Sequence, residues 1–196
     1  YLKGDEGMAQ AAALRIAGSG DIYEPSVREN ASVNFITCHD GFTLYDLYSY
    51  NEKHNESNGW DNTDGSNDNH SWNCGTEGET KNEAVNALRR RMIRNACAVL
   101  MCSRGIPMFL AGDEFGNTQF GNNNPYCHDD EVSWLDWSLL DKNWDIFRFF
   151  QFMIHFRKEH PVLRSNISDG FGGLPDISFH GTSPWIKEFS SYRSEE

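Results

Sequence analysis

The sequence predicts an α/β protein in which helices cover a parallel sheet, and two observations lead to this fold class. Helical and extended patterns alternate along the 196 residues in the order helix, strand, loop, helix, strand, loop, helix. A polar pair that contains at least one acidic residue follows each predicted strand: His39-Asp40 follows the first, and Asp113-Glu114 follows the second. Polar residues at the carboxyl ends of parallel strands are typical of a (β/α)8 barrel, so we expect part of such a barrel.

The first half of the chain supplies a helix, a strand and a long polar loop. Residues 5–17 carry apolar side chains at helical spacing, and a Gly-Ser-Gly triplet ends that helix. The mixed apolar pattern of residues 32–38 predicts a strand that is covered on both faces. A short aromatic helical turn over residues 42–50 follows. Residues 51–79 then form a loop dense in Asn, Asp and Gly, which we expect to be functional because loops beyond ~12–15 residues are uncommon.

The clearest helix runs from a capping-box pattern at residues 80–83 to about residue 103. One side of this helix is apolar at helical spacing. The apolar stripe consists of Val85, Leu88, Met92, Ala96 and Val99. Four arginines, at positions 89, 90, 91 and 94, predict a solvated or salt-bridged face rather than a nucleic-acid site.

A second strand and a second long helix complete the pattern. Residues 106–111 are a compact apolar run with Pro107 at its beginning, where a strand tolerates proline. A polar loop follows to residue 137. Residues 144–159 form an aromatic-rich helix that Pro161 ends, and its wide apolar surface predicts burial on several sides.

We expect two parts in the chain. Residues 1–164 carry the alternating helix and strand pattern, and residues 165–196, rich in Gly, Ser and Pro, form a linker that leads towards another domain. The chain begins Tyr-Leu-Lys-Gly-Asp, with no Met and no signal peptide, so we expect a piece of a longer cytoplasmic polypeptide. The missing N-terminal part of that polypeptide is an expected partner.

Charge and composition argue against several classes of function. The net charge of −12 and the pI near 4.9 disfavour a nucleic-acid partner, whose phosphates need clustered Lys and Arg. No stretch approaches the ~18 apolar residues of a membrane span, so no membrane partner is expected. The five cysteines suggest no disulfide framework, and a zinc site built from Cys38-His39 and Cys127-His128 fits no common spacing. We expect no metal and no cofactor.

Asp40 follows a predicted buried strand directly, with His39 before it and a glycine after it. An aspartate at this place can be a nucleophile, an electrostatic stabiliser, a metal ligand or a structural cap. A lone His-Asp pair is more often structural, because short motifs match by chance. The second acidic pair, Asp113-Glu114, favours a functional site, although capping explains that pair equally well.

Sugar hydrolysis needs the residue types that gather after these strands. Carboxylates stabilise the positive charge of its transition state, and sugar rings stack on aromatic side chains. The two long loops supply candidate stacking platforms and amide partners for sugar hydroxyls. These candidates are Trp60, Trp72, Asn122 and Asn123. The asparagines equally suit turn conformations, and Trp134 and Trp137 are predicted to be packing residues.

Three separated stretches carry a resemblance to known proteins. They are NFITCHDGFTLYDLYSYNEKHNESNG, SWNCGTEGET and GIPMFLAGDEFGNTQFGNNNPYCHDDEVSWLDW. Together they resemble the isoamylase-type glycogen and starch debranching enzymes of the α-amylase superfamily, from about residue 3 to residue 164. The resemblance implies that residues 1–164 are the C-terminal portion of a catalytic (β/α)8 TIM barrel, strands 7 and 8 with their helices. It also implies that residues 165–196 are a linker or the start of a C-terminal β-domain.

The resemblance also implies residue roles. Asp40 matches the family's third catalytic carboxylate, which stabilises the transition state, and His39 matches a histidine that hydrogen-bonds the same sugar ring. Asp113 and Glu114 match the end of the eighth strand, and residues 122–124 match the loop beside the substrate cleft.

The implied activity is hydrolysis of α-1,6 branch linkages in glycogen, amylopectin or limit dextrin, by the retaining mechanism. The family's nucleophilic Asp and general-acid Glu follow strands four and five. Neither motif occurs in this chain, so we expect the chain alone to be inactive. Two alternatives stay open: a non-catalytic glucan-binding relative, and a trehalose-releasing or branching enzyme of the same superfamily.

Overall fold

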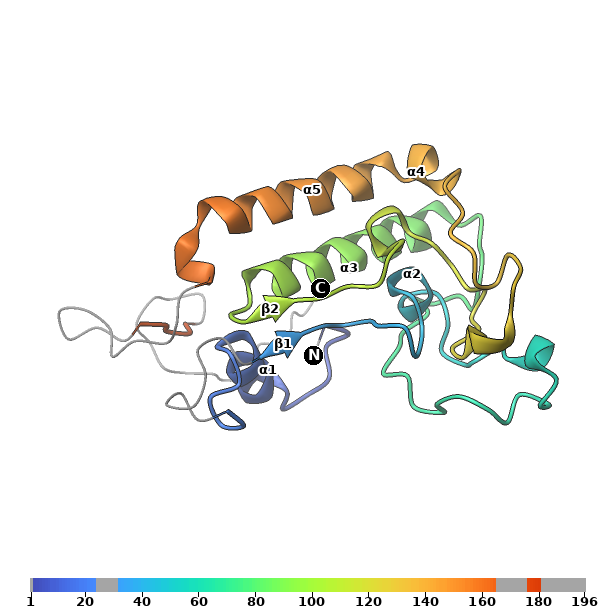
Figure 1. Cartoon of the computed structure of the whole chain (residues 1–196), viewed down its shortest axis with the longest axis horizontal. Coiled ribbons are helices and arrows are strands. Elements are labelled where there is room, and N and C mark those ends of the chain that lie inside the picture. The colour runs from blue at the N-terminus through green and yellow to red at the C-terminus, as the bar shows by residue number, and fades with distance from the viewer. Residues whose placement is uncertain (1, 24–31, 165–175, 181–196) are drawn as a thin grey trace.

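The structure is a computed structural model that describes residues 2–23, 32–164 and 176–180. Two parallel strands lie at its centre, with the long helices along one side and the long loops beyond the strands' C-terminal ends (Figure 1). β1 (Val33–Asn34) pairs with β2 (Ile106–Pro107), Val33 opposite Ile106. α3 (Glu83–Cys102) connects the two strands. The α/β class is therefore confirmed in the described residues, because a parallel pair needs such a crossover.

The helical layer consists mainly of α3 and α5 (Trp144–Glu159), which lie alongside each other in Figure 1. Their facing side chains form most of the apolar core. The buried members from these two helices are Met92, Ile93, Ala96, Cys97, Leu100, Met101, Ile146, Phe150 and Met153. α1 (Ala9–Ile16) contacts α3. α5 is not buried on several sides here, because Phe152 and Trp144 are about half exposed on its outer side.

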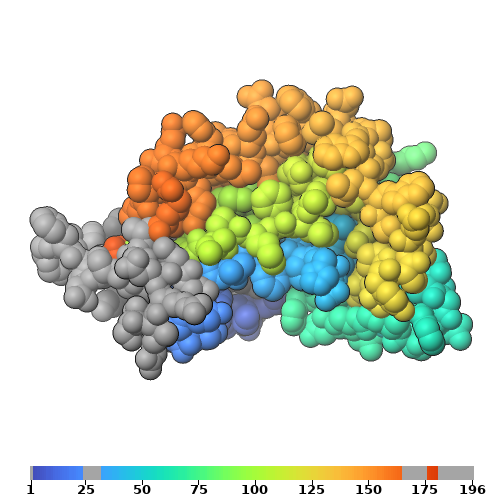
Figure 2. Space-filling model, in the orientation of Figure 1, coloured from blue at the N-terminus to red at the C-terminus, as the bar shows by residue number. Residues whose placement is uncertain are grey.

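Shorter elements position the loops. α2 (Leu44–Leu47) follows β1, and α4 (Leu139–Lys142) precedes α5. The remaining elements are single turns of 3-10 helix. They are η1 (Glu56–Asn58), η2 (Asp113–Phe115), η3 (Pro125–Cys127) and η4 (Pro161–Leu163). Figure 2 shows the teal and the yellow loop segments gathered at one end of the molecule.

The start of α3 differs from the predicted capping box. Asn82, not Thr80, is the N-cap: its side chain accepts from the backbone N–H groups of Ala84 at 3.0 Å and Val85 at 3.3 Å. Thr80 instead accepts from the N–H of Asn82 at 3.1 Å. An amide oxygen caps a helix as well as a hydroxyl does, and here it lies nearer the first turn.

The arginine face of α3 is only partly the expected solvated face. Arg90 and Arg94 pair with Asp145 of α5, at 2.5 and 3.1 Å, and Arg91 is exposed. Arg89 is only 1% exposed, which contradicts the prediction for that residue. The buried face of α3 therefore includes Arg89 and Ile93 beside Met92 and Ala96 of the predicted apolar stripe.

Both strands are shorter than predicted, two residues each instead of residues 32–38 and 106–111. In the described chain each strand has one neighbour, so extended residues beyond the pair lack a ladder partner. One face of the pair is also open rather than covered. Val33, Phe35, Ile106 and Met108 are each 40–55% exposed.

Most of residues 165–196, predicted to be a linker or the start of a β-domain, lies outside the described residues. In the parts of the chain that the structure describes, no helix has the length and apolar character needed to cross a membrane.

Candidate active site

His39 and Asp40 lie in the turn between β1 and α2, just beyond the C-terminal end of the strand. Their side chains are 85% and 82% exposed, and His39 Nε2 is 3.5 Å from Asp40 Oδ2. The N–H of Gly41 donates to the carbonyl oxygen of Asn123 at 3.0 Å, which ties this turn to the loop after β2. The carboxylate is therefore fixed through its backbone while its oxygens remain open to a ligand.

Asp113 lies at the corresponding place after β2, but it points into the protein. Its side chain accepts from Thr37 Oγ1 at 2.5 Å and from the N–H groups of Leu44 at 2.8 Å and Leu110 at 3.2 Å. Burial raises the pKa of Asp113 to about 6, against the opposing effect of these hydrogen bonds. At 1% exposure it joins the ends of the two strands, which is the capping role that the sequence left open.

Glu114 occupies a different environment from Asp113. It is partly exposed, and its Oε2 accepts from the N–H of Gly112 at 2.8 Å. It also lines a cavity of about 360 Å³ whose other walls include Phe109 and Phe150. Most of the other residues that line this cavity belong to α5, so Glu114 lies beside that helix.

Asn122 and Asn123 are 2% and 3% exposed, so their amides serve other loop residues. Asn122 Nδ2 donates to Asn58 Oδ1 at 2.6 Å. Asn123 Nδ2 donates to Asn69 Oδ1 at 2.7 Å, and its Oδ1 accepts from Asn55 at 2.8 Å. These bonds join residues 55–69 to residues 122–124, and Asn123 in turn accepts a hydrogen bond from Gly41 in the His-Asp turn.

The two tryptophans of the long loop differ in accessibility. Trp60 is 59% exposed and can present its ring to a ligand. Trp72 is partly buried against the core, and its backbone N–H donates to the carbonyl oxygen of Leu47 at 2.9 Å. It lines a largely apolar cavity of about 490 Å³ beside β1. Of these two tryptophans, Trp60 is the one in the open position that a stacking platform needs.

Arg89, which the sequence placed on a solvated face, holds the end of the long loop. Its guanidinium donates to the carbonyl oxygens of Gly78 at 2.7 Å, Asn73 at 3.1 Å and Thr76, with a longer contact of 3.5 Å to Ser49. In the sequence, Arg89 differs from the other three arginines of this helix only because Met92 and Ile93 follow it at the helical spacing of three and four residues.

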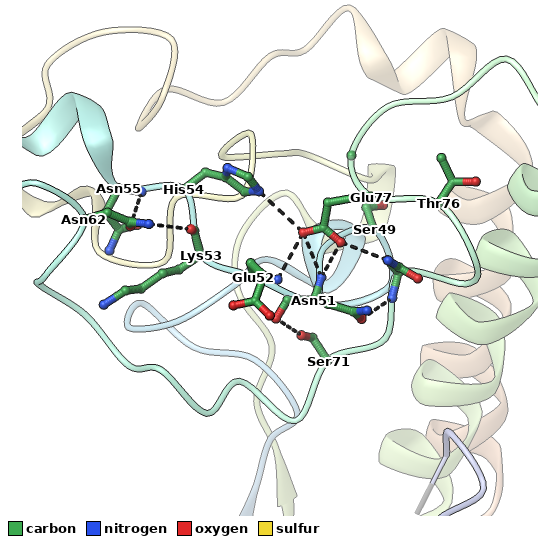
Figure 3. A network of polar contacts seen from close by, with 12 residues as sticks. Ser49, Asn51, Glu52, Lys53, His54, Asn55, Asn62, Ser71, Thr76 and Glu77 are labelled. Atoms are coloured by element: carbon green, nitrogen blue, oxygen red, sulfur yellow. Dashed lines mark hydrogen bonds and ion pairs between the residues drawn. The ribbon is translucent and has the colours of Figure 1, made fainter.

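Glu77 continues this support inside the loop, as Figure 3 shows. Its carboxylate accepts from the N–H groups of Asn51 and Glu52, at 2.8 and 3.0 Å, and from Asn73 Nδ2 at 2.9 Å. His54 approaches it at 3.4 Å. Residues 51–79 are therefore an ordered loop with its own polar core.

Asp46 was also missed by sequence reasoning. It is fully buried in α2 and accepts from Thr118 Oγ1 at 2.5 Å and from the N–H of Gln119 at 2.7 Å. Burial raises its pKa from the usual 3.8 to about 6. The folded protein thus binds this proton more tightly than the unfolded chain does. The resulting stabilisation is complete below about pH 4 and is lost as the pH rises through about 6.

Among residues 2–23, 32–164 and 176–180, no three His, Cys, Asp or Glu side chains gather where they could hold an ion. The five cysteines are free thiols, and Cys74 and Cys97 lie in the core.

Comparisons with known proteins fit this site and fold. No family model matches the chain. A protein named glycogen operon protein GlgX homolog, from Mycobacterium tuberculosis, is 53% identical over 165 residues, 84% of this chain and 23% of its own length. Isoamylase 3 of rice is 48% identical over 182 residues, 92% of this chain and 23% of its own length. The chain belongs to the isoamylase and GlgX family. It thus spans about a quarter of the length of the curated relatives it matches.

Solved structures place the family member within the α-amylase superfamily. A pullulanase from Paenibacillus barengoltzii, solved with maltohexaose and α-cyclodextrin, superposes with a TM-score of 0.61 at 28% identity. The match covers 84% of this chain and 22% of the pullulanase. The α/β arrangement described above is therefore similar to part of the pullulanase fold, which belongs to the α-amylase superfamily.

Proposed function

We propose that the full-length protein containing this chain hydrolyses α-1,6 branch linkages of glycogen or starch. The observation that carries the proposal is the close sequence relationship to isoamylases and GlgX proteins, at 48–53% identity over most of the chain. Branched α-glucans such as glycogen, amylopectin and limit dextrin are the substrates in this proposal, and the cytoplasm is the proposed location.

In this proposal β1 and β2 are the seventh and eighth strands of a barrel. Their exposure pattern supports it: Val33, Phe35, Ile106 and Met108 leave apolar surface open on the face opposite the helices. Apolar side chains inside a barrel are covered by the other strands. The nucleophile and the general acid then belong to other parts of the same polypeptide.

Asp40 is the catalytic residue that this chain contributes. A glycosidase transition state carries positive charge on the sugar ring, and a nearby carboxylate lowers its energy. Asp40 suits that role because its backbone is held by the Gly41–Asn123 hydrogen bond while its carboxylate is 82% exposed. His39, beside it, supplies a hydrogen bond to the same sugar, and Trp60 supplies an aromatic face.

The test replaces Asp40 with Asn in the full-length protein. Loss of one charge facing the developing cation should lower kcat by about 100-fold or more, since such electrostatic contributions are worth ~3–4 kcal/mol. His39→Ala should cost about 10–100-fold, because it removes a hydrogen bond worth ~1.5–3 kcal/mol. Asp141→Asn, at an exposed aspartate of α4, is the control. Near-normal rates in both site variants would make the pair structural and overturn the assignment.

Bond choice is tested by digesting amylopectin and linear amylose in parallel and separating the products by chromatography. Linear chains released from amylopectin, with amylose unchanged, are the expected result. Short maltooligosaccharides from amylose would instead identify an ordinary amylase. Binding of both glucans without any product would identify a non-catalytic relative.

A further inference from the structure

A groove of about 580 Å³ lies between the loop after β2 and the segment that leads into α4. Its volume is in the range of small-ligand sites. Phe120 and Trp134 both line it, and they are 46% and 57% exposed. Neither belongs to the site described above, and Trp134 was predicted to be a packing residue. Two large aromatic side chains on one concave surface need an explanation.

Phe120 is held in a conformation that its side chain disfavours. Its φ is +56°, in the left-handed region where a bulky residue is an outlier. The neighbouring backbone enforces this: Thr118 and Gln119 are bound to buried Asp46, and Thr118 Oγ1 accepts from the N–H of Phe120 at 2.9 Å. Such strain costs about 1–3 kcal/mol and is concentrated at functional sites. Here it keeps an aromatic ring on the surface.

Trp134 is also fixed rather than free. Its indole Nε1 donates to Asp129 Oδ1 at 3.1 Å, and its backbone N–H donates to the carbonyl oxygen of Asp130 at 2.9 Å. The residue nevertheless remains 57% exposed. An exposed ring whose orientation is set in advance loses little entropy when a flat ligand stacks on it.

The polar lining indicates the chemistry of the ligand. Three exposed carboxylates, Glu79, Glu131 and Asp136, line the groove together with Lys142. An anionic ligand would be repelled by this excess of negative charge. A neutral ligand with many hydroxyl groups can donate to the carboxylates while its apolar faces contact the rings.

We infer that this groove binds a linear α-glucan chain, with Phe120 and Trp134 as its stacking platforms. The inference rests on the proposed function for its choice of glucan. The position of Phe120 in the chain supports it, because Phe120 directly precedes Gly121–Asn123, and Asn123 accepts from the N–H of Gly41 in the His-Asp turn. The groove would hold an outer chain of the branched substrate.

Phe120→Gly in the full-length protein is the sharpest test, because glycine accepts the left-handed conformation without strain. The thermal midpoint should therefore stay the same or rise, while affinity for amylopectin, measured by affinity gel electrophoresis, should fall about three- to tenfold. Trp134→Ala should weaken binding by a similar factor, and Trp134→Phe, which keeps a ring, should weaken it less. Phe152→Ala, at an exposed aromatic residue of α5, is the matched control and should bind normally.

The same gels separate this inference from the proposed function. Normal amylopectin binding by correctly folded Phe120→Gly and Trp134→Ala proteins would overturn the inference, whatever the hydrolytic activity. Equal weakening by the Phe152→Ala control would do the same, since the effect would not be specific to the groove. Weakened binding that persists in a protein without α-1,6 activity would keep the groove and reject only the debranching proposal.

Discussion

Arg89→Met removes the guanidinium that holds the end of the long loop but keeps an apolar stem against the core. Three carbonyl oxygens, those of Gly78, Asn73 and Thr76, then lose a charged donor inside the protein. A hydrogen bond to a charged donor is worth ~1.5–3 kcal/mol, and three such bonds are lost together here. We therefore expect local opening of residues 51–79 to become easier by about 3–5 kcal/mol.

Limited proteolysis of the full-length protein measures this opening, because cleavage within an ordered loop follows the population of its open form. A protease that cuts beside large apolar residues can act at Trp60 and Trp72. A free energy of opening that is lower by about 3–5 kcal/mol raises the open population at least a hundredfold. The Arg89→Met protein should therefore be cut there at least a hundredfold faster than the unchanged protein. Arg91→Met, at an exposed arginine of the same helix, should be cut at the original rate.

Equal cleavage of the Arg89 and Arg91 variants would refute this reasoning, because it would mean that the carbonyl contacts do not order the loop. Arg89→Lys gives a further check. A lysine is a single point donor and cannot serve three carbonyls at once, so it should restore only part of the protection.

Two further predictions concern stability. In the unchanged protein, Asp46 makes the free energy of unfolding fall by up to about 1.4 kcal/mol per pH unit between pH 4 and 6. Asp46→Asn mimics the protonated carboxyl, so this part of the fall should disappear. Urea titrations at several pH values measure this, and an unchanged slope, or the same flattening in Asp141→Asn, would contradict it. Gly105→Ala should lower the thermal midpoint more than Gly75→Ala does. Both glycines have positive φ, but only a Cβ at Gly105 would meet Ser32 O, at 2.5 Å; equal shifts in calorimetry would count against a steric cause.

Several features could be predicted because they depend on neighbours in the sequence. The long helices at 83–102 and 144–159 follow from apolar spacing and end signals, and α2 from a short aromatic run after a polar turn. The family followed from three separated motifs, which the relatives confirm. The placement of His39 and Asp40 after a strand was predicted too, although β1 ends at Asn34, four residues before the predicted end.

The sequence by itself thus determined the fold class, the family, the long helices and the position of the His-Asp pair. Only the tertiary structure decided which polar residues face inward. Asp113, Asn122, Asn123 and Arg89 have the composition of a binding surface, yet each is buried and hydrogen-bonded. Most of their partners lie 11 to 76 residues away, so no local pattern records them. Trp134 shows the converse: it was predicted to be a packing residue, yet it is 57% exposed. The exposure of an aromatic residue depends on which surface the rest of the chain leaves uncovered.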